Sequence, residues 1–180
     1  MNTLVLGLGN SILKDDGAGP AVINELRRFP LPSNVALETT NQCGMPLLDI
    51  LAGYDTLIIV DALQDYLKPG ETIWLGVDDF VSRETPQSQH HMDILRMLEI
   101  GRTLDLNVPA DVKILAIGTK DIRDFGEGLS PGVKKAVPEA AGMIVNKIRE
   151  MGGDKLPYSL LAGGKKILDK NRGVKYVENK

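Results

Sequence analysis

The sequence has little of the residue types that disulfides, metal clusters and membrane spans require. Cys43 is the single cysteine among 180 residues, which excludes an internal disulfide and any cluster that takes several thiolates from this chain. No uninterrupted apolar run approaches the roughly 18 residues of a membrane-spanning helix. The N-terminus also lacks the basic and apolar regions of a signal peptide. We therefore expect a protein of the reducing cytoplasm, with no direct membrane insertion.

A strong excess of charge of either sign is also absent. The formal net charge is -3, from 21 basic and 24 acidic residues. We therefore expect no general attraction to nucleic acid or to anionic lipid. The sequence is 43% hydrophobic, which is enough for one globular domain with a sizeable core.

Hydrophobic periodicity predicts an α/β fold. Strands are expected where short apolar or alternating runs are bounded by turn residues, at 4–8, 35–39, 56–61, 72–77 and 112–118. Helices are expected where apolar residues recur at helical spacing, at 20–29, at 44–53, from 92 onwards and from 131 onwards.

The spacing of these elements predicts how they are arranged. The connection before residues 72–77 is too short for a helical crossover, so that strand should be antiparallel at a sheet edge. We predict a single three-layer α/β domain over residues 1–152, with a mostly parallel twisted sheet and helices on both faces. Residues 153–180 are expected to form a basic C-terminal tail without an assigned domain.

Two adjacent carboxylates, Asp15 and Asp16, follow the first predicted strand and precede Pro20. One interpretation is that they cap the helix that begins near Pro20. The other is that they belong to a functional site at the carboxyl edge of the sheet. A dinucleotide-binding turn is not favoured, because residues 10–16 intervene before the helix and a third glycine is missing. No organic cofactor is therefore predicted.

Other polar residues should reach the same edge. Asp61 ends a buried strand, and the two histidines, His90 and His91, end a polar loop at 83–89. In open parallel sheets the ligand crevice lies beyond the carboxyl ends of the strands, so Asp16, Asp61 and a histidine should meet there. Alternatively, Asp61 caps a turn and the histidines are polar caps or surface groups.

Together, Asp16, Asp61 and His90 would supply two carboxylates and one imidazole. This is an incomplete shell for a divalent metal, with positions left for water or for ligands from a partner. Nitrogen and oxygen donors accept nickel or zinc, and the composition does not choose between them. Cys43 is not favoured as a nucleophile, because no basic residue stands beside it in the sequence.

Four motifs stand along the chain in a fixed order. They are Leu-Gly-Leu-Gly-Asn at 6–10 followed by Asp-Asp-Gly-Ala-Gly at 15–19, Ile-Ile-Val-Asp-Ala at 58–62, Ser-Gln-His-His-Met at 88–92, and Gly-Leu-Ser-Pro at 128–131. With them the sequence resembles the hydrogenase maturation endopeptidases, which process the large subunit of nickel-iron hydrogenases. The resemblance runs from Met1 to about Met151.

The resemblance implies an endopeptidase that removes the C-terminal extension of a nickel-iron hydrogenase large-subunit precursor after nickel insertion. It also implies that Asp16, Asp61 and His90 bind the nickel ion, which the substrate carries and which acts as the recognition signal. The family's histidine is followed, after one residue, by an apolar helix residue. Met92 fits that spacing for His90, and His91 is the alternative ligand.

The attacking group stays open in the sequence. No Ser-His-Asp arrangement is visible. Asp15 or Asp16 could activate a water, as in an aspartyl-type endopeptidase, or a bound metal could polarise that water. Residues 39–44 differ from the Asp-Gly-Gly-Thr-like stretch of the family, so substrate recognition by this loop does not carry over. The tail after residue 152 lies outside the resemblance.

Two other classes of protein fit parts of the pattern. A receiver-like phosphoacceptor signalling domain would use Asp15, Asp16, Asp61 and Lys120. However, residues 10–14 push the acidic pair too far from the strand, and such a domain has no use for the histidines. A non-enzymatic chaperone that binds nickel or the precursor would use the metal-binding residues without cutting the substrate.

Overall fold

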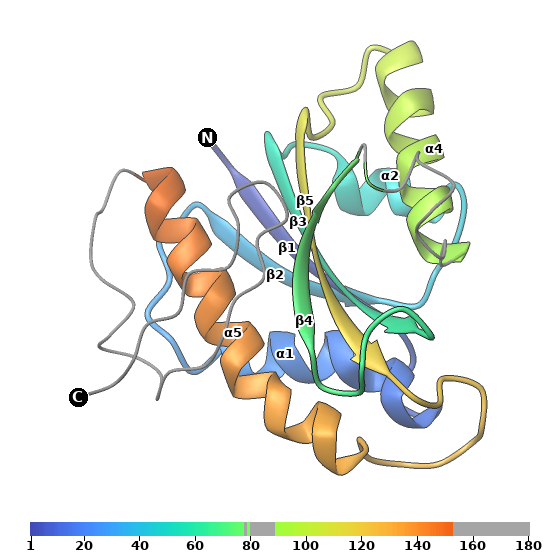
Figure 1. Ribbon diagram of the computed structural model, residues 1–180. Helices are drawn as coiled ribbons and strands as arrows, with labels where there is room; N and C mark the ends of the chain where they lie inside the picture. The colour runs from blue at the N-terminus through green and yellow to red at the C-terminus, as the bar shows by residue number, and fades with distance from the viewer. Residues whose placement is uncertain (78, 80–88, 153–180) are drawn as a thin grey trace.

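The computed structural model describes residues 1–77, 79 and 89–152, except for the side chains of residues 89–92. These residues form a five-stranded sheet in the order β2-β1-β3-β5-β4 (Figure 1). The strands are β1 (Thr3–Leu8), β2 (Val35–Thr40), β3 (Thr56–Gln64), β4 (Thr72–Gly76) and β5 (Asp111–Thr119). All neighbouring pairs are parallel except β4 and β5. The predicted mostly parallel sheet with an antiparallel edge strand is confirmed.

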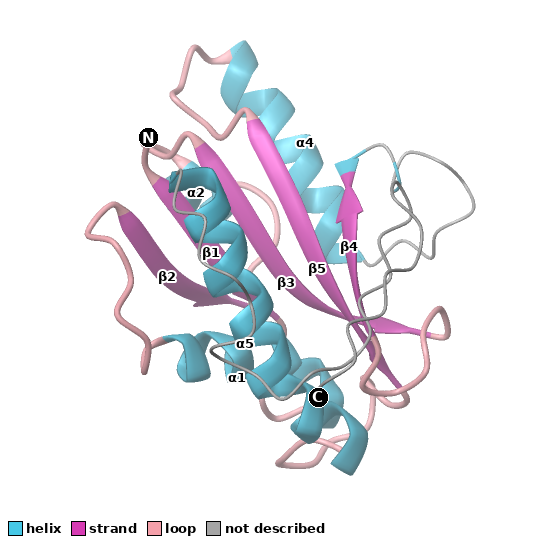
Figure 2. Cartoon of the chain, turned by 60° about the vertical axis from the view of Figure 1, so that its left-hand side comes forward, coloured by secondary structure: helices cyan, strands magenta, loops and turns pink. Residues whose placement is uncertain are grey.

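Helices cover both faces of this sheet (Figure 2). The helical elements are the 3-10 helix η1 (Lys14–Gly17), α1 (Ala18–Leu26), α2 (Pro46–Leu51), α4 (Gln89–Thr103) and α5 (Pro131–Gly152). One hydrophobic core joins α1 and α5 to the sheet, and another joins α2 and α4 to its opposite face. The predicted three layers are therefore confirmed. Within the described residues, no helix is both long enough and apolar enough to cross a membrane.

The order of the strands creates a junction between β1 and β3. The chain leaves β1 through α1 on one face to reach β2, and then reaches β3 through α2 on the other face. At such a switch point the loops diverge from neighbouring strands, and a crevice opens at the carboxyl edge of the sheet. The fold therefore favours this junction as the place for a functional site.

A close approach of α1 to the sheet sets the geometry of the junction. A Cβ atom at Gly19 would lie 2.3 Å from the carbonyl oxygen of Leu8 and 2.6 Å from that of Val60. Only glycine fits at this distance, because real Cβ atoms do not approach backbone atoms so closely. The start of α1 is thereby held against the carboxyl ends of both β1 and β3.

The predicted end of the central strand is wrong. Asp61 was expected to terminate β3, but the strand continues to Gln64. The reason is that β5 is equally long and pairs with β3 from Thr56 as far as Gln64. Asp61 consequently lies inside a strand, where pairing with Ala116 of β5 fixes its backbone.

Candidate active site

Asp15 is almost fully buried in η1, with 1% of its surface exposed. Its Oδ1 atom accepts the backbone N–H of Ser130 at 2.7 Å, and its Oδ2 atom accepts that of Lys120 at 3.5 Å. These donors stand at the start of α5 and at the end of β5. The capping interpretation is therefore wrong for α1, whose N-cap residue is Gly17. The Asp15 carboxylate instead joins η1 to the β5–α5 loop.

Lys14, which is partly exposed, adds further bonds between η1 and the β5–α5 loop. Its Nζ atom lies 2.7 Å from the Asp121 carboxylate and 3.0 Å from that of Asp124. Its backbone N–H donates to the carbonyl oxygen of Gly126 at 2.9 Å, and the N–H of Gly126 donates to Ile12 at 3.0 Å. We call residues 12–15 together with residues 120–130 the clasp. No motif or periodicity in the sequence indicates the clasp.

The ion pairs of the clasp also change the acidity of their members. The hydrogen bond from Lys14 holds the pKa of Asp121 well below its usual range, and backbone N–H groups of Asp124 and Arg123 act in the same direction. The two carboxylates raise the pKa of Lys14. Because these groups are largely open to solvent, the pairs contribute little to stability and mainly fix geometry.

Asp16 is held against the turn that follows β1. It is 8% exposed, and its Oδ2 atom accepts the backbone N–H of Asn10 at 2.6 Å. Gly9 makes this approach possible, because its φ is +125° and a Cβ atom there would lie 1.9 Å from the carbonyl oxygen of Asp16. The turn therefore fixes the Asp16 carboxylate at the carboxyl end of β1.

Asp61 comes to the same junction from β3. It is 1% exposed, and its Oδ1 atom accepts the backbone N–H of Ala62 at 2.8 Å. The pairing of β1 with β3 ends where Gly7 lies beside Val60, so Asp61 follows the last paired residue. Contacts between η1 and β3 bring the segments of Asp16 and Asp61 together.

The face of β3 that carries Asp61 is the face covered by α4. Side chains alternate along a strand, and Leu57, Ile59 and Leu63 belong to the core that α4 and α2 cover. Asp61 is two residues from Ile59 and two from Leu63, so its side chain lies on the same face. The C-terminal end of α4 leads into the start of β5, so the first turn of α4 lies toward the carboxyl edge (Figure 1).

Both histidines lie in this first turn, because α4 begins at Gln89. The polar loop predicted at residues 83–89 falls almost entirely outside the described residues, as do the imidazoles of His90 and His91. Among the side chains that the structure describes, no group of three His, Cys, Asp or Glu residues is arranged to hold a metal ion. The metal-binding set Asp16, Asp61 and His90, with His91 as the alternative, therefore stays a prediction.

Cys43 connects the β2–α2 loop to the start of α4. Its side chain is exposed, and it interacts with the carboxylate of Asp93 in α4. Partial desolvation, followed by the hydrogen bond and the charge of Asp93, raises the pKa of the Cys43 thiol. A raised pKa leaves less thiolate at neutral pH, which agrees with the interpretation that Cys43 is not a nucleophile.

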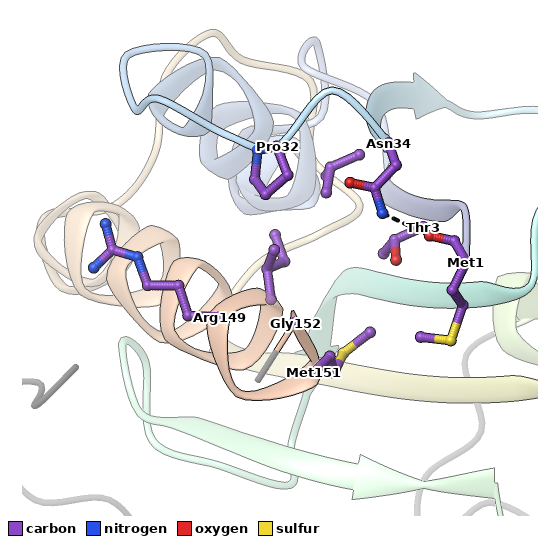
Figure 3. A pocket seen from close by; sticks show the side chains of 9 residues that line it. Met1, Thr3, Pro32, Asn34, Arg149, Met151 and Gly152 are labelled. Carbon is purple, nitrogen blue, oxygen red and sulfur yellow. Dashed lines mark hydrogen bonds between the residues drawn. The ribbon is translucent and has the colours of Figure 1, made fainter. Parts of the chain in front are cut away.

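A pocket of about 400 Å³ lies at the other edge of the sheet (Figure 3). It is formed by the amino ends of β1 and β2 and by the last turns of α5. Asn34 crosses part of it and donates to the backbone oxygen of Met1 at 2.6 Å. The lining includes apolar side chains such as Ile148 and one charged residue, Arg149, but no carboxylate. Without an acid or a nucleophile, this pocket is not the candidate active site.

Comparison with known protein families gives a match over most of the chain. A family model described as hydrogenase maturation protease, HycI, matches residues 20–147. Asp61 and the two histidines fall inside the matched range, whereas Asp15 and Asp16 precede it.

Individual relatives and solved structures extend the similarity. The hydrogenase expression/formation protein HupD of Bradyrhizobium diazoefficiens is 29% identical over 152 residues, covering 83% of this chain and 79% of that protein. The hydrogenase 2 maturation protease of Escherichia coli is 26% identical over 163 residues, covering 87% of this chain and 96% of that protein. The structure of the maturating endopeptidase HybD from E. coli aligns with a TM-score of 0.74 at 27% identity, covering 84% of this chain and 94% of that one.

Proposed function

Since the chain belongs to the hydrogenase maturation protease family and is therefore a peptidase, we propose that it processes a nickel-iron hydrogenase large-subunit precursor. The proposed reaction removes the C-terminal extension of that precursor after nickel has been inserted. We place the reaction in the cytoplasm, the reducing compartment that the single cysteine favours.

One observation carries the proposal: two buried carboxylates, Asp16 and Asp61, come from different segments to the junction of β1 and β3. Carboxylate oxygens together with an imidazole are donors that a borderline ion such as nickel accepts. The first turn of α4 lies on the face that Asp61 shares and carries His90 and His91.

In this proposal, nickel belongs to the substrate. The ion is held by thiolates of the precursor, and Asp16, Asp61 and His90 add contacts that nickel-free precursor cannot make. These contacts place the peptide bond beside the crevice. Cleavage then depends on correct metal loading, because unloaded precursor does not gain the binding energy that positions the bond.

We assign the activation of water to Asp16 rather than Asp15. Both oxygens of Asp15 accept backbone N–H groups from the β5–α5 loop, which gives that carboxylate a structural task. Acting as a general base, Asp16 takes a proton from water as the water oxygen attacks the peptide carbonyl carbon. The carbon–nitrogen bond then breaks, and the leaving amine takes up the proton that Asp16 received from the water. This is aspartyl-type chemistry, which Asp16 performs in addition to its contact with the nickel.

The two alternatives, a chaperone and a receiver-like domain, differ from this proposal because neither would cleave the precursor. A chaperone would bind the loaded precursor and release it uncut, and a receiver-like domain would have no interaction with it. Membership in a protease family favours cleavage over both.

Mass spectrometry of the precursor tests the proposal directly. The cognate large-subunit precursor is incubated, with or without nickel, with the wild-type protein, the His90→Ala variant or the matched His91→Ala variant. We expect clipping of the nickel-loaded precursor only, lost in His90→Ala and retained in His91→Ala. Equal clipping without nickel would remove the role of the metal as a signal, and an intact loaded precursor would indicate a binding protein.

A further inference from the structure

Two large apolar side chains of the clasp stand exposed at the carboxyl edge of the sheet. Ile12 is 50% exposed and Phe125 is 81% exposed, although most large hydrophobic side chains of the described residues lie in the two cores. They come from the two segments of the clasp. A single exposed hydrophobic residue needs no explanation, but two on adjoining segments beside a candidate active site point to an interaction surface.

The backbone beneath these residues is firmly cross-linked. The N–H of Gly126, which follows Phe125, donates to the carbonyl oxygen of Ile12 at 3.0 Å. Leu13 and Gly126 form an isolated β-bridge, and the N–H of Lys14 donates to Gly126 at 2.9 Å. A contact surface on such a base loses little backbone entropy on binding, because its backbone is already ordered.

The same segments also hold the candidate active site. Ile12 lies between Asn10, whose N–H donates to the Asp16 carboxylate, and Asp16 itself. Phe125 belongs to the loop whose ends donate to the Asp15 carboxylate, through Lys120 and Ser130. A molecule that lies over Ile12 and Phe125 therefore contacts the two segments that hold the Asp15 and Asp16 carboxylates.

The charges around the two residues are balanced. Apart from the buried Asp15, the clasp carries three cations and three carboxylates, namely Lys14, Lys120, Arg123, Asp121, Asp124 and Glu127. An apolar centre with a rim of mixed charge is typical of a protein–protein contact. A polyanion such as nucleic acid would require a basic surface, which the clasp does not provide.

We propose that Ile12 and Phe125 form a docking contact for the hydrogenase large-subunit precursor, on the part of its surface that borders the cleavage site. This inference rests on the proposed function, because that function supplies the identity of the partner. Docking at these residues aligns the precursor with Asp16 through a shared segment of chain. The contact is independent of nickel, so it contributes equally to the binding of loaded and unloaded precursor.

The test separates binding from cleavage. The dissociation constant is measured for immobilised nickel-free precursor, and kcat/KM is measured for nickel-loaded precursor. The variants are Ile12→Ser, Phe125→Ser and the conservative Phe125→Leu. The matched control is Leu104→Ser, because Leu104 is 57% exposed and follows α4 at the amino edge of the sheet.

We expect Phe125→Ser to raise Kd by about tenfold, as truncation of an interface anchor typically does. Ile12→Ser should raise Kd less, Phe125→Leu should recover most of the affinity, and Leu104→Ser should leave Kd unchanged. Wild-type affinity in both serine variants, or failure of the wild-type protein to bind the precursor, would overturn the docking proposal. Binding that depends on Phe125 without any clipping would support docking and would instead refute the proposed endopeptidase function.

Discussion

At the carboxyl edge of the sheet, three buried aspartates, Asp15, Asp16 and Asp61, gather where β1 and β3 separate. At the amino edge, the 400 Å³ pocket is lined mainly by apolar side chains and has Arg149 as its charged residue. The pocket provides a cavity without an acid or a nucleophile, whereas the aspartates offer the chemistry. For this fold, the position of ionisable groups is therefore a better guide to function than the volume of a cavity.

Backbone geometry does not distinguish the two edges. The carboxyl edge contains Gly9 at a φ of +125° and Lys14 at a φ of 45°, and the amino edge contains Gly53 at a φ of +87° and Asp105 at a φ of 53°. The difference between the edges lies in their ionisable groups. It predicts that substitutions at the carboxyl edge affect activity and those at the amino edge do not.

The largest expected effect is the loss of activity on substitution of Asp61. Asp61→Asn keeps the shape of the side chain but removes the charge, and we expect kcat/KM to fall by at least about 100-fold, the upper range for disturbance of a metal site. Arg149→Ala, at the amino-edge pocket, is the control and should retain wild-type turnover of nickel-loaded precursor. Similar losses in both variants would remove the distinction between the edges.

A smaller effect, on stability, is expected when the close approach of α1 to the sheet is disturbed. Gly19→Ala places a methyl group against the carbonyl oxygens of Leu8 and Val60, so we expect the free energy of unfolding to fall by about 2 kcal/mol. The control is Gly142→Ala in α5, where nothing lies within 4 Å of the added Cβ atom. That change should be neutral or stabilising. Urea unfolding measures both, and a stable Gly19→Ala variant would show that α1 can shift away.

The structural task of Asp15 predicts a loss of stability. Asp15→Asn replaces an acceptor oxygen with an amide that cannot accept from the backbone, so we expect about 1 kcal/mol of lost unfolding free energy. Asp124→Asn is the control, because its carboxylate is 72% exposed and its ion pair with Lys14 should contribute little to stability. Denaturant unfolding at pH 7 compares them. Equal stabilities would mean that the buried bonds of Asp15 are not needed.

The smallest effect concerns the reactivity of Cys43. Its raised pKa predicts slow alkylation by iodoacetamide at pH 7 and a steep increase in rate as pH rises through the thiol pKa, because only the thiolate reacts. Asp93→Asn removes the neighbouring charge, which lowers the pKa of the Cys43 thiol, and should accelerate alkylation at pH 7. The chain has one cysteine, so mass spectrometry reports this site alone. Rapid alkylation of the wild-type protein at pH 7 would contradict the assigned environment.

Much of the fold is predictable because the pattern of apolar residues along the sequence indicates the strands and helices. The apolar runs at residues 4–8, 56–61 and 112–118 are found as β1, β3 and β5, and their parallel pairing follows from the helices between them. The rule for parallel sheets also places Asp16 and Asp61 at the edge where they are found. The end of β3 is not predictable in this way, because the polar residue Asp61 indicates a stop although pairing with β5 continues to Gln64.

The clasp is not predictable in the same way. Lys14 lies 107 residues from Asp121 and 110 residues from Asp124 along the chain, and neither separation leaves a periodic pattern. The contact of Cys43 with Asp93 is likewise created by packing of α4 beside the β2–α2 loop. Local propensity identifies helices and strands, whereas such side-chain pairs exist only after the elements have assembled.

The central position of β3 has a consequence for hydrogen exchange. It pairs with β1 as far as Val60 and with β5 as far as Gln64, so we expect the amides near Asp61 to exchange through opening of the whole domain. The amides of η1 depend on the loop bonds of the clasp and can exchange through local opening. The Asp61 carboxylate in β3 and the Asp16 carboxylate in η1 thus belong to parts of the domain with different local stability. In mild denaturant, Asp16 should leave its position while Asp61 is still in place, and activity should disappear before the protein unfolds.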